Sequence, residues 1–72
     1  MTTTKLNTQL LKDCRARKGW SLLRAADELG VTLQTLISLE TGKHQPRAST
    51  LHRIATVYGE EMSRFYETVS AT

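Results

Sequence analysis

Apolar residues in the middle of the chain follow a helical spacing that is interrupted once, at Gly30. Residues 26–40 read A-D-E-L-G-V-T-L-Q-T-L-I-S-L-E, and their apolar positions fall on one side of two helices that meet at a steep angle. Gly30 follows the first helix, where a left-handed backbone costs a residue without Cβ little, and Thr32 can accept the first free N–H groups of the second helix. The pattern predicts a helix-turn-helix, although a plain helical hairpin in another all-α domain would share it.

Helix-capping residues place one more helix before this motif. Asn7 can cap a first helix that runs to about residue 18, and Ser21 can cap the helix over residues 22–29 that leads into the turn. The helix after the turn covers residues 33 to about 40.

Two further helices are expected in the second half of the chain. Ser49 or Thr50 can cap a fourth helix that runs to about residue 58. A fifth is predicted from about residue 60 to residue 69, because acidic residues in its first turn suit the helix dipole and its apolar residues have helical spacing. We therefore predict an all-α fold, a single domain of five helices over residues 1–72 with residues 1–6 as a frayed N-terminal arm.

Length and composition limit the class of protein. A chain of 72 residues with 39% hydrophobic and 24% charged residues is one small domain near the lower size limit for a self-sufficient core, so a partner chain is plausible. Apolar runs are too short for a membrane span and no secretory leader pattern precedes the domain, so a soluble cytoplasmic protein is expected. The lone Cys14 fits a reducing compartment.

The net charge of +3 is modest, but it is unevenly distributed. Residues 1–47 contain eight Lys and Arg against four Asp and Glu, whereas residues 48–72 contain two against three. The basic surplus therefore lies in the half that contains the helix-turn-helix, as a surface that faces phosphates would require.

Several spaced segments together resemble a known family. The stretches K-G-W-S, A-A-D-E-L-G-V-T, T-L-I-S-L-E-T-G-K and T-L-H-R-I-A-x-x-Y-G are similar to the Cro and lambda-repressor type of helix-turn-helix domain, the XRE family, from about Leu10 to Tyr66. The resemblance implies a five-helix lambda-repressor-like fold whose third helix enters the major groove of double-stranded DNA. The residues it places at base edges are Leu33, Gln34, Thr35 and Ser38. Among them Gln34 is the best reader, because its amide can bond both N6 and N7 of adenine.

The resemblance also implies contacts outside base reading. The residues at the family's phosphate and groove positions are Ser21, Lys43, Gln45 and Arg47. Arg15 and Glu40 match a buried ion pair that joins the first helix to the recognition helix. A homodimer on a two-fold operator is expected, with an interface around the apolar residues Tyr58, Met62, Phe65, Tyr66 and Val69. The alternative is that this apolar stripe belongs to the core of one protomer, as some of it must.

Some of the positions that depart from the family pattern leave an alternative open. Leu22 stands where the family commonly has Gln, and Ile37 where a polar residue is common. With Leu33 they could form an apolar patch that binds another regulator, which would make the chain a protein-protein interaction module that keeps the fold.

The sequence contains no group of residues with the spacing that is typical of a catalytic site. His44 and His52 lack metal-ligand spacing, and no carboxylate or nucleophile is placed beside either. We therefore expect a DNA-binding, repressor-like regulator rather than an enzyme, with no cofactor and no metal.

Overall fold

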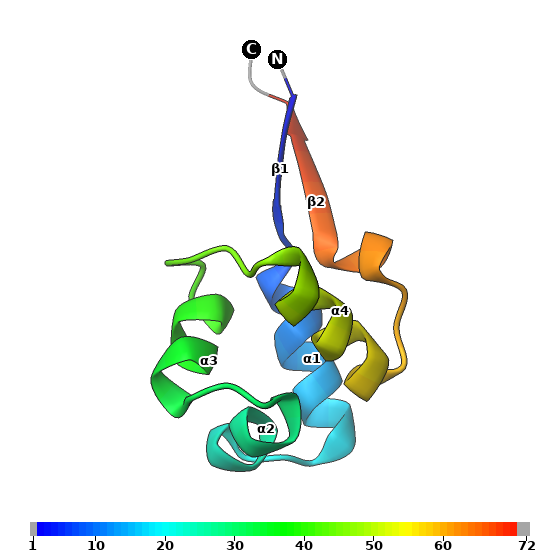
Figure 1. Cartoon of the computed structure of the whole chain (residues 1–72). Coiled ribbons are helices and arrows are strands. Elements are labelled where there is room, and N and C mark those ends of the chain that lie inside the picture. Colours follow the sequence, from blue (N-terminus) through cyan, green and yellow to red (C-terminus); the bar gives the residue numbers. More distant parts are fainter. Residues whose placement is uncertain (1, 71–72) are drawn as a thin grey trace.

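Four α-helices form the body of the protein in the computed structural model, which describes residues 2–70. They are α1 (Thr8–Lys18), α2 (Leu22–Leu29), α3 (Leu33–Glu40) and α4 (Ala48–Tyr58). Figure 1 shows them packed together into one body. Asn7 accepts a hydrogen bond from the backbone N–H of Leu10 at 3.1 Å, and Ser21 accepts one from Arg24 at 3.1 Å. These caps satisfy N–H groups that the helix itself leaves free, which explains why α1 and α2 start where the sequence predicts.

The core lies where the four helices meet, and every helix contributes to it. Its most buried large side chains are Leu6, Leu11, Leu29, Leu36, Leu51, Ile54 and Phe65. Trp20 lies at the edge of this core with its ring centroid 5.8 Å from that of Tyr58. The predicted helical domain with a helix-turn-helix at α2 and α3 is therefore confirmed, with four α-helices rather than five in the described residues.

The predicted frayed arm is wrong, because residues 2–6 form a strand. β1 (Thr2–Leu6) pairs antiparallel with β2 (Tyr66–Ser70), and the register runs from Thr2 opposite Ser70 to Leu6 opposite Tyr66. Threonine favours extended backbone, and Leu6 is only 2% exposed, so its burial fixes the base of the strand to the body. Figure 1 shows this two-stranded arm projecting from the helices.

The predicted fifth helix is wrong for the same reason. Residues Met62–Phe65 form a short 3₁₀ helix, η1, and the chain then becomes β2. The backbone N–H of Asn7 donates to the carbonyl of Phe65 at 2.6 Å, which starts the strand pairing. A partner strand 60 residues earlier in the chain thus overrides a helical pattern of apolar residues.

The apolar residues expected at a dimer interface have different environments. Phe65 is 0% exposed and Tyr58 is 8% exposed, so both belong to the core of one protomer and that part of the interface prediction is wrong. Met62 packs half-buried against the same core, whereas Tyr66 is 42% exposed. The side chain of Val69 lies outside the described residues.

Candidate nucleic-acid interface

The unit formed by α2, the turn and α3 is fixed by its turn residues and by apolar contact between the helices. Gly30 has a φ of 72°, and Thr32 accepts a hydrogen bond from the backbone N–H of Thr35 at 3.1 Å. The side chains that join the two helices are at most 2% exposed: Ala26, Leu29, Leu36 and Leu39. The opposite face of α3 is thereby held outward on a rigid support, as Figure 1 shows.

The first turn of α3 presents three exposed side chains. Leu33 is 40% exposed, and Gln34 and Thr35 are also exposed. The amide of Gln34 forms no hydrogen bond with another residue in the range 2–70, so both its donor and its acceptor are free. The hydroxyl of Thr35 already accepts a hydrogen bond from the hydroxyl of Thr32 at 2.8 Å. Gln34 is therefore the side chain on this turn best able to bond a base edge.

Ser38 does not face outward as we expected. It is only 8% exposed, because the chain folds back after α3 and the backbone N–H of Lys43 donates to the Ser38 carbonyl at 2.9 Å. Ser38 is one of the residues that line a groove beside α3.

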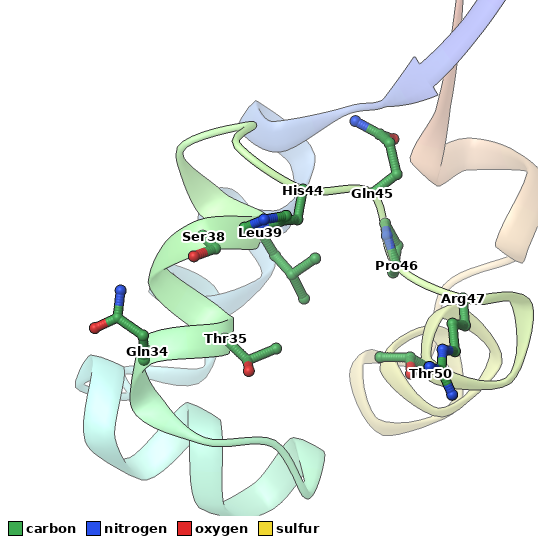
Figure 2. Close-up of a pocket in the computed structure, with 9 residues that line it drawn as sticks. All are labelled: Gln34, Thr35, Ser38, Leu39, His44, Gln45, Pro46, Arg47 and Thr50. Carbon is green, nitrogen blue, oxygen red and sulfur yellow. The ribbon is translucent and has the colours of Figure 1, made fainter.

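A groove of about 420 Å³ separates α3 from the segment that leads into α4. Its walls are Gln34, Thr35, Ser38, Leu39, His44, Gln45, Pro46, Arg47 and Thr50. Figure 2 shows Thr35 and Leu39 directed toward α4, whereas the amide of Gln34 points away from it. The groove thus adjoins the exposed turn of α3, and the loop residue His44 is part of its wall.

Two of the predicted phosphate contacts are exposed cations beside this groove. Lys43 and Arg47 are exposed, and neither forms an ion pair with another described residue. Arg47 is also the N-cap of α4, where no side chain accepts the free N–H groups. Unneutralised cations next to free backbone donors favour an anion.

Ser21 and Gln45 are more constrained than the other two predicted phosphate contacts. The Ser21 hydroxyl is exposed but already caps α2. The Gln45 side-chain oxygen accepts a hydrogen bond from the backbone N–H of Leu6 at 2.8 Å, so Gln45 joins the loop after α3 to the base of β1. This bond could not be predicted from the sequence, because residues 1–6 were expected to be a frayed arm.

The predicted ion pair between Arg15 and Glu40 is present. Arg15 Nε lies 2.9 Å from Glu40 Oε2, and Arg15 Nη2 donates to Glu40 Oε1 at 3.2 Å. A third guanidinium nitrogen donates to the Trp20 carbonyl at 3.2 Å. The hydrogen bond to Glu40 raises the pKa of Arg15 above its ordinary value, so the guanidinium stays charged and ties α1 to the end of α3.

The predicted apolar patch is only partly exposed. Leu22 packs half-buried against the core and Ile37 is also half-buried, which leaves Leu33 as the exposed member. Leu23 has a larger exposed fraction, 68%, and the sequence patterns did not single it out.

Over residues 2–70, no group of three His, Cys, Asp or Glu side chains could hold a metal ion. None of the helices described is both long and apolar enough to cross a membrane.

The family model for HTH_3, described as helix-turn-helix, matches residues 11–65. The chain is 43% identical over 49 residues to YonR of Bacillus subtilis, an uncharacterized HTH-type transcriptional regulator derived from the SPbeta prophage. It is 38% identical over 52 residues to an uncharacterized HTH-type transcriptional regulator of Methanothermobacter thermautotrophicus. These alignments include 68% and 72% of this chain, and 45% and 75% of the two relatives. The chain thus spans less than half of YonR.

Solved structures share the fold. An HTH_3 family transcriptional regulator from Vibrio cholerae matches with a TM-score of 0.70 and 33% identity, over 81% of this chain and 33% of that protein. A crystal structure of HppE with FeII matches with a TM-score of 0.73 and 30% identity, over 83% of this chain and 32% of HppE. The similarity to HppE therefore covers about a third of that protein.

Proposed function

Because the chain belongs to the HTH_3 helix-turn-helix family, whose members include HTH-type transcriptional regulators, we propose that it binds DNA sequence-specifically and represses transcription. In this proposal α3 enters the major groove and its first turn reads base edges. The observation that carries the proposal is the exposed amide of Gln34 on α3, beside the groove between α3 and the segment before α4. Next to this groove lie Lys43 and Arg47, which form no ion pair with another described residue.

Base reading is assigned chiefly to two residues of that turn. Gln34 would bond N6 and N7 of an adenine with its amide, and the exposed Leu33 would contact a thymine methyl group. Thr35 and Ser38 would contribute less, because the Thr35 hydroxyl already accepts a hydrogen bond from the Thr32 hydroxyl and Ser38 is largely covered.

Phosphate binding is assigned to the loop after α3. Lys43 and Arg47 would neutralise phosphates on one strand, together with the uncapped N-terminus of α4. Ser21 would add a contact at the start of α2. Such contacts fix the position of the domain on the duplex without reading its sequence.

The operator is proposed to be two-fold symmetric and bound by a dimer. A single domain of this size contacts only a few base pairs, and a dimer doubles the contact and sets the spacing of the half-sites to about 34–36 Å, one helical turn. YonR and the other relatives support the regulatory role through the family that they share with this chain.

Selection from a random duplex library, followed by fluorescence anisotropy at several salt concentrations, tests this function. We expect a two-fold motif whose affinity falls steeply with salt. Lys43→Ala should reduce the slope of log K against log salt by about 1 and weaken all sequences alike. Lys12→Ala, which removes the same charge from an exposed position on α1, is the matched control and should leave the slope almost unchanged.

Failure to enrich any motif would contradict the proposal. The alternative of a protein-binding module rests on the exposure of Leu23 and Leu33. It predicts binding to a protein partner that is insensitive to salt and lost in Leu33→Ser, with no preferred DNA sequence.

A further inference from the structure

The loop between α3 and α4 contains both cations assigned to phosphates, and its middle has few attachments to the body. Before the middle, the backbone N–H of Lys43 donates to the Ser38 carbonyl at 2.9 Å. After it, the Arg47 carbonyl accepts from the backbone N–H of Leu51 at 2.9 Å. Residues 44–46 form no backbone–backbone hydrogen bond with another described residue, and the first two of them are exposed.

One side chain joins this middle segment to a distant part of the chain. The Gln45 side-chain oxygen accepts a hydrogen bond from the backbone N–H of Leu6 at 2.8 Å, across 39 positions of sequence. Figure 2 shows the Gln45 side chain extending from the loop toward the light-blue strand β1.

The geometry of the strands explains why Leu6 requires an acceptor from outside the arm. Asn7 donates across the ladder to the Phe65 carbonyl, so the N–H of the preceding residue, Leu6, is directed away from β2. Leu6 is only 2% exposed, so water has little access to this N–H, and buried backbone donors are almost always paired. The bond therefore satisfies a buried donor in β1 and also fixes the middle of the loop after α3.

We propose that Gln45 is a positioning residue for DNA binding. Through its bond to Leu6, strand β1 holds the loop after α3 in the conformation in which Lys43 and Arg47 meet phosphates. A loop that is ordered before binding loses less conformational entropy when it contacts the DNA. This inference rests on the proposed DNA binding, and it gives Gln45 a different role from the direct phosphate contact expected from the sequence.

Two other roles for Gln45 lead to different results. A direct phosphate contact by its amide would add to the affinity whether or not the neighbouring cations are present. A bond that only stabilises the fold would lower the Tm and leave the DNA affinity of the folded protein unchanged.

Hydrogen exchange and relaxation measured by NMR without DNA test the bond itself. Gln45→Met keeps the length of the side chain but removes the acceptor, whereas Gln45→Glu keeps an oxygen that can accept from Leu6. We expect the Leu6 amide to exchange at least tenfold faster in Gln45→Met, with increased motion at residues 44 and 45, and to stay protected in Gln45→Glu. Gln9→Met, at an exposed position on α1, is the matched control and should change neither measurement.

A double-mutant cycle on the selected operator separates positioning from direct contact. Fluorescence anisotropy is measured at low salt, where a protein without both cations still binds, and at a temperature at which circular dichroism shows every variant folded. We expect Gln45→Met to weaken binding by about five- to tenfold in the wild-type background. In the Lys43→Ala/Arg47→Ala background the loss should be less than about twofold, because the ordered loop no longer places a cation.

A shorter side chain makes the test independent of one variant. Gln45→Asn keeps the amide but lacks one methylene group, so it does not reach Leu6 and should lose as much affinity as Gln45→Met. Gln9→Met should bind as the wild type does.

Wild-type affinity in Gln45→Met, or the same loss with and without the two cations, would overturn the inference. Unchanged exchange of the Leu6 amide in Gln45→Met would overturn it as well. Failure of the proposed function would appear in the wild type, as the absence of any selected operator, so the two failures are distinguishable.

Discussion

Replacing Arg15 with methionine should destabilise the domain far more than replacing a similar arginine on the same helix. Arg15 donates twice to Glu40 and once to the Trp20 carbonyl, and the Glu40 side chain is only 6% exposed. Methionine keeps the apolar stem of Arg15 but leaves a buried carboxylate without its partner. The cost is therefore chiefly electrostatic.

The size of this cost follows from burial. Stranding one charge of a buried pair costs about 3–5 kcal/mol, and since the Arg15 side chain is 24% exposed, water can reach the site and the lower figure applies. A domain of this length is stable by about 4–11 kcal/mol. Arg15→Met should thus remove about 3 kcal/mol and lower the Tm by about 12–24 °C.

Urea unfolding of four variants separates the charge effect from loss of packing. Glu40→Gln should cost only about 1 kcal/mol, because water can still reach the partly exposed guanidinium of Arg15. The double variant Arg15→Met/Glu40→Gln should be more stable than Arg15→Met alone, since it buries no unpaired charge. Arg17→Met is the matched control: the Arg17 side chain is 62% exposed in its pair with Glu60, so we expect a much smaller loss than for Arg15→Met.

A loss for Arg15→Met that equals the loss for Arg17→Met would refute this reasoning. The same holds if the loss of unfolding free energy in the double variant equals the sum of the losses in the two single variants, because the coupling energy between Arg15 and Glu40 would then be zero.

Three further predictions concern buried or strained positions. Burial raises the pKa of Tyr58 from 10.0 to about 12, so the neutral phenol stabilises the folded state fully below pH 10, and this stabilisation is lost as the pH rises from 10 through 12. Urea titrations across this range should show the free energy of unfolding fall by up to about 2–3 kcal/mol. Tyr58→Phe should abolish this fall. Burial also raises the pKa of the Cys14 thiol, so an aromatic disulfide reagent at pH 8 should react only at the rate of unfolding, and immediate reaction would show that the thiol is accessible. Gly30→Ala should cost about 1–2 kcal/mol for its positive φ and little more for moving the end of the flexible Arg53 side chain, so thermal melts should show nearly the same loss for Gly19→Ala, which has a similar backbone and open space around it.

Local rules predicted the helical body correctly because its boundaries depend on neighbouring residues. Asn7, Ser21 and Thr32 each bond a backbone N–H three residues later, which is visible as a capping pattern in the sequence. The start of α4 was missed by two or three residues, since Arg47 occupies the N-cap without a side-chain bond and the stronger capping types, Ser49 and Thr50, lie inside the helix.

The arm could not be predicted from the same rules, because its two strands are 60 residues apart in the chain. The spacing of Met62, Phe65 and Tyr66 fits a helix locally, and only the pairing with β1 decides against it. The bond between Gln45 and Leu6 depends on that pairing as well. For the candidate site, position on α3 indicated Gln34, whereas the covering of Ser38 by the following loop needed the structure.

The most direct test of the proposed DNA binding compares the wild type and Gln34→Ala on a selected operator and on duplexes with each base pair of one half-site replaced. For the wild type, one A·T pair should be required, and its replacement should cost about 1–3 kcal/mol of binding. Gln34→Ala should bind the operator and that replaced duplex equally while still discriminating at other positions, and Gln9→Ala on α1 should behave as the wild type. Undiminished discrimination by Gln34→Ala at every position would contradict the account.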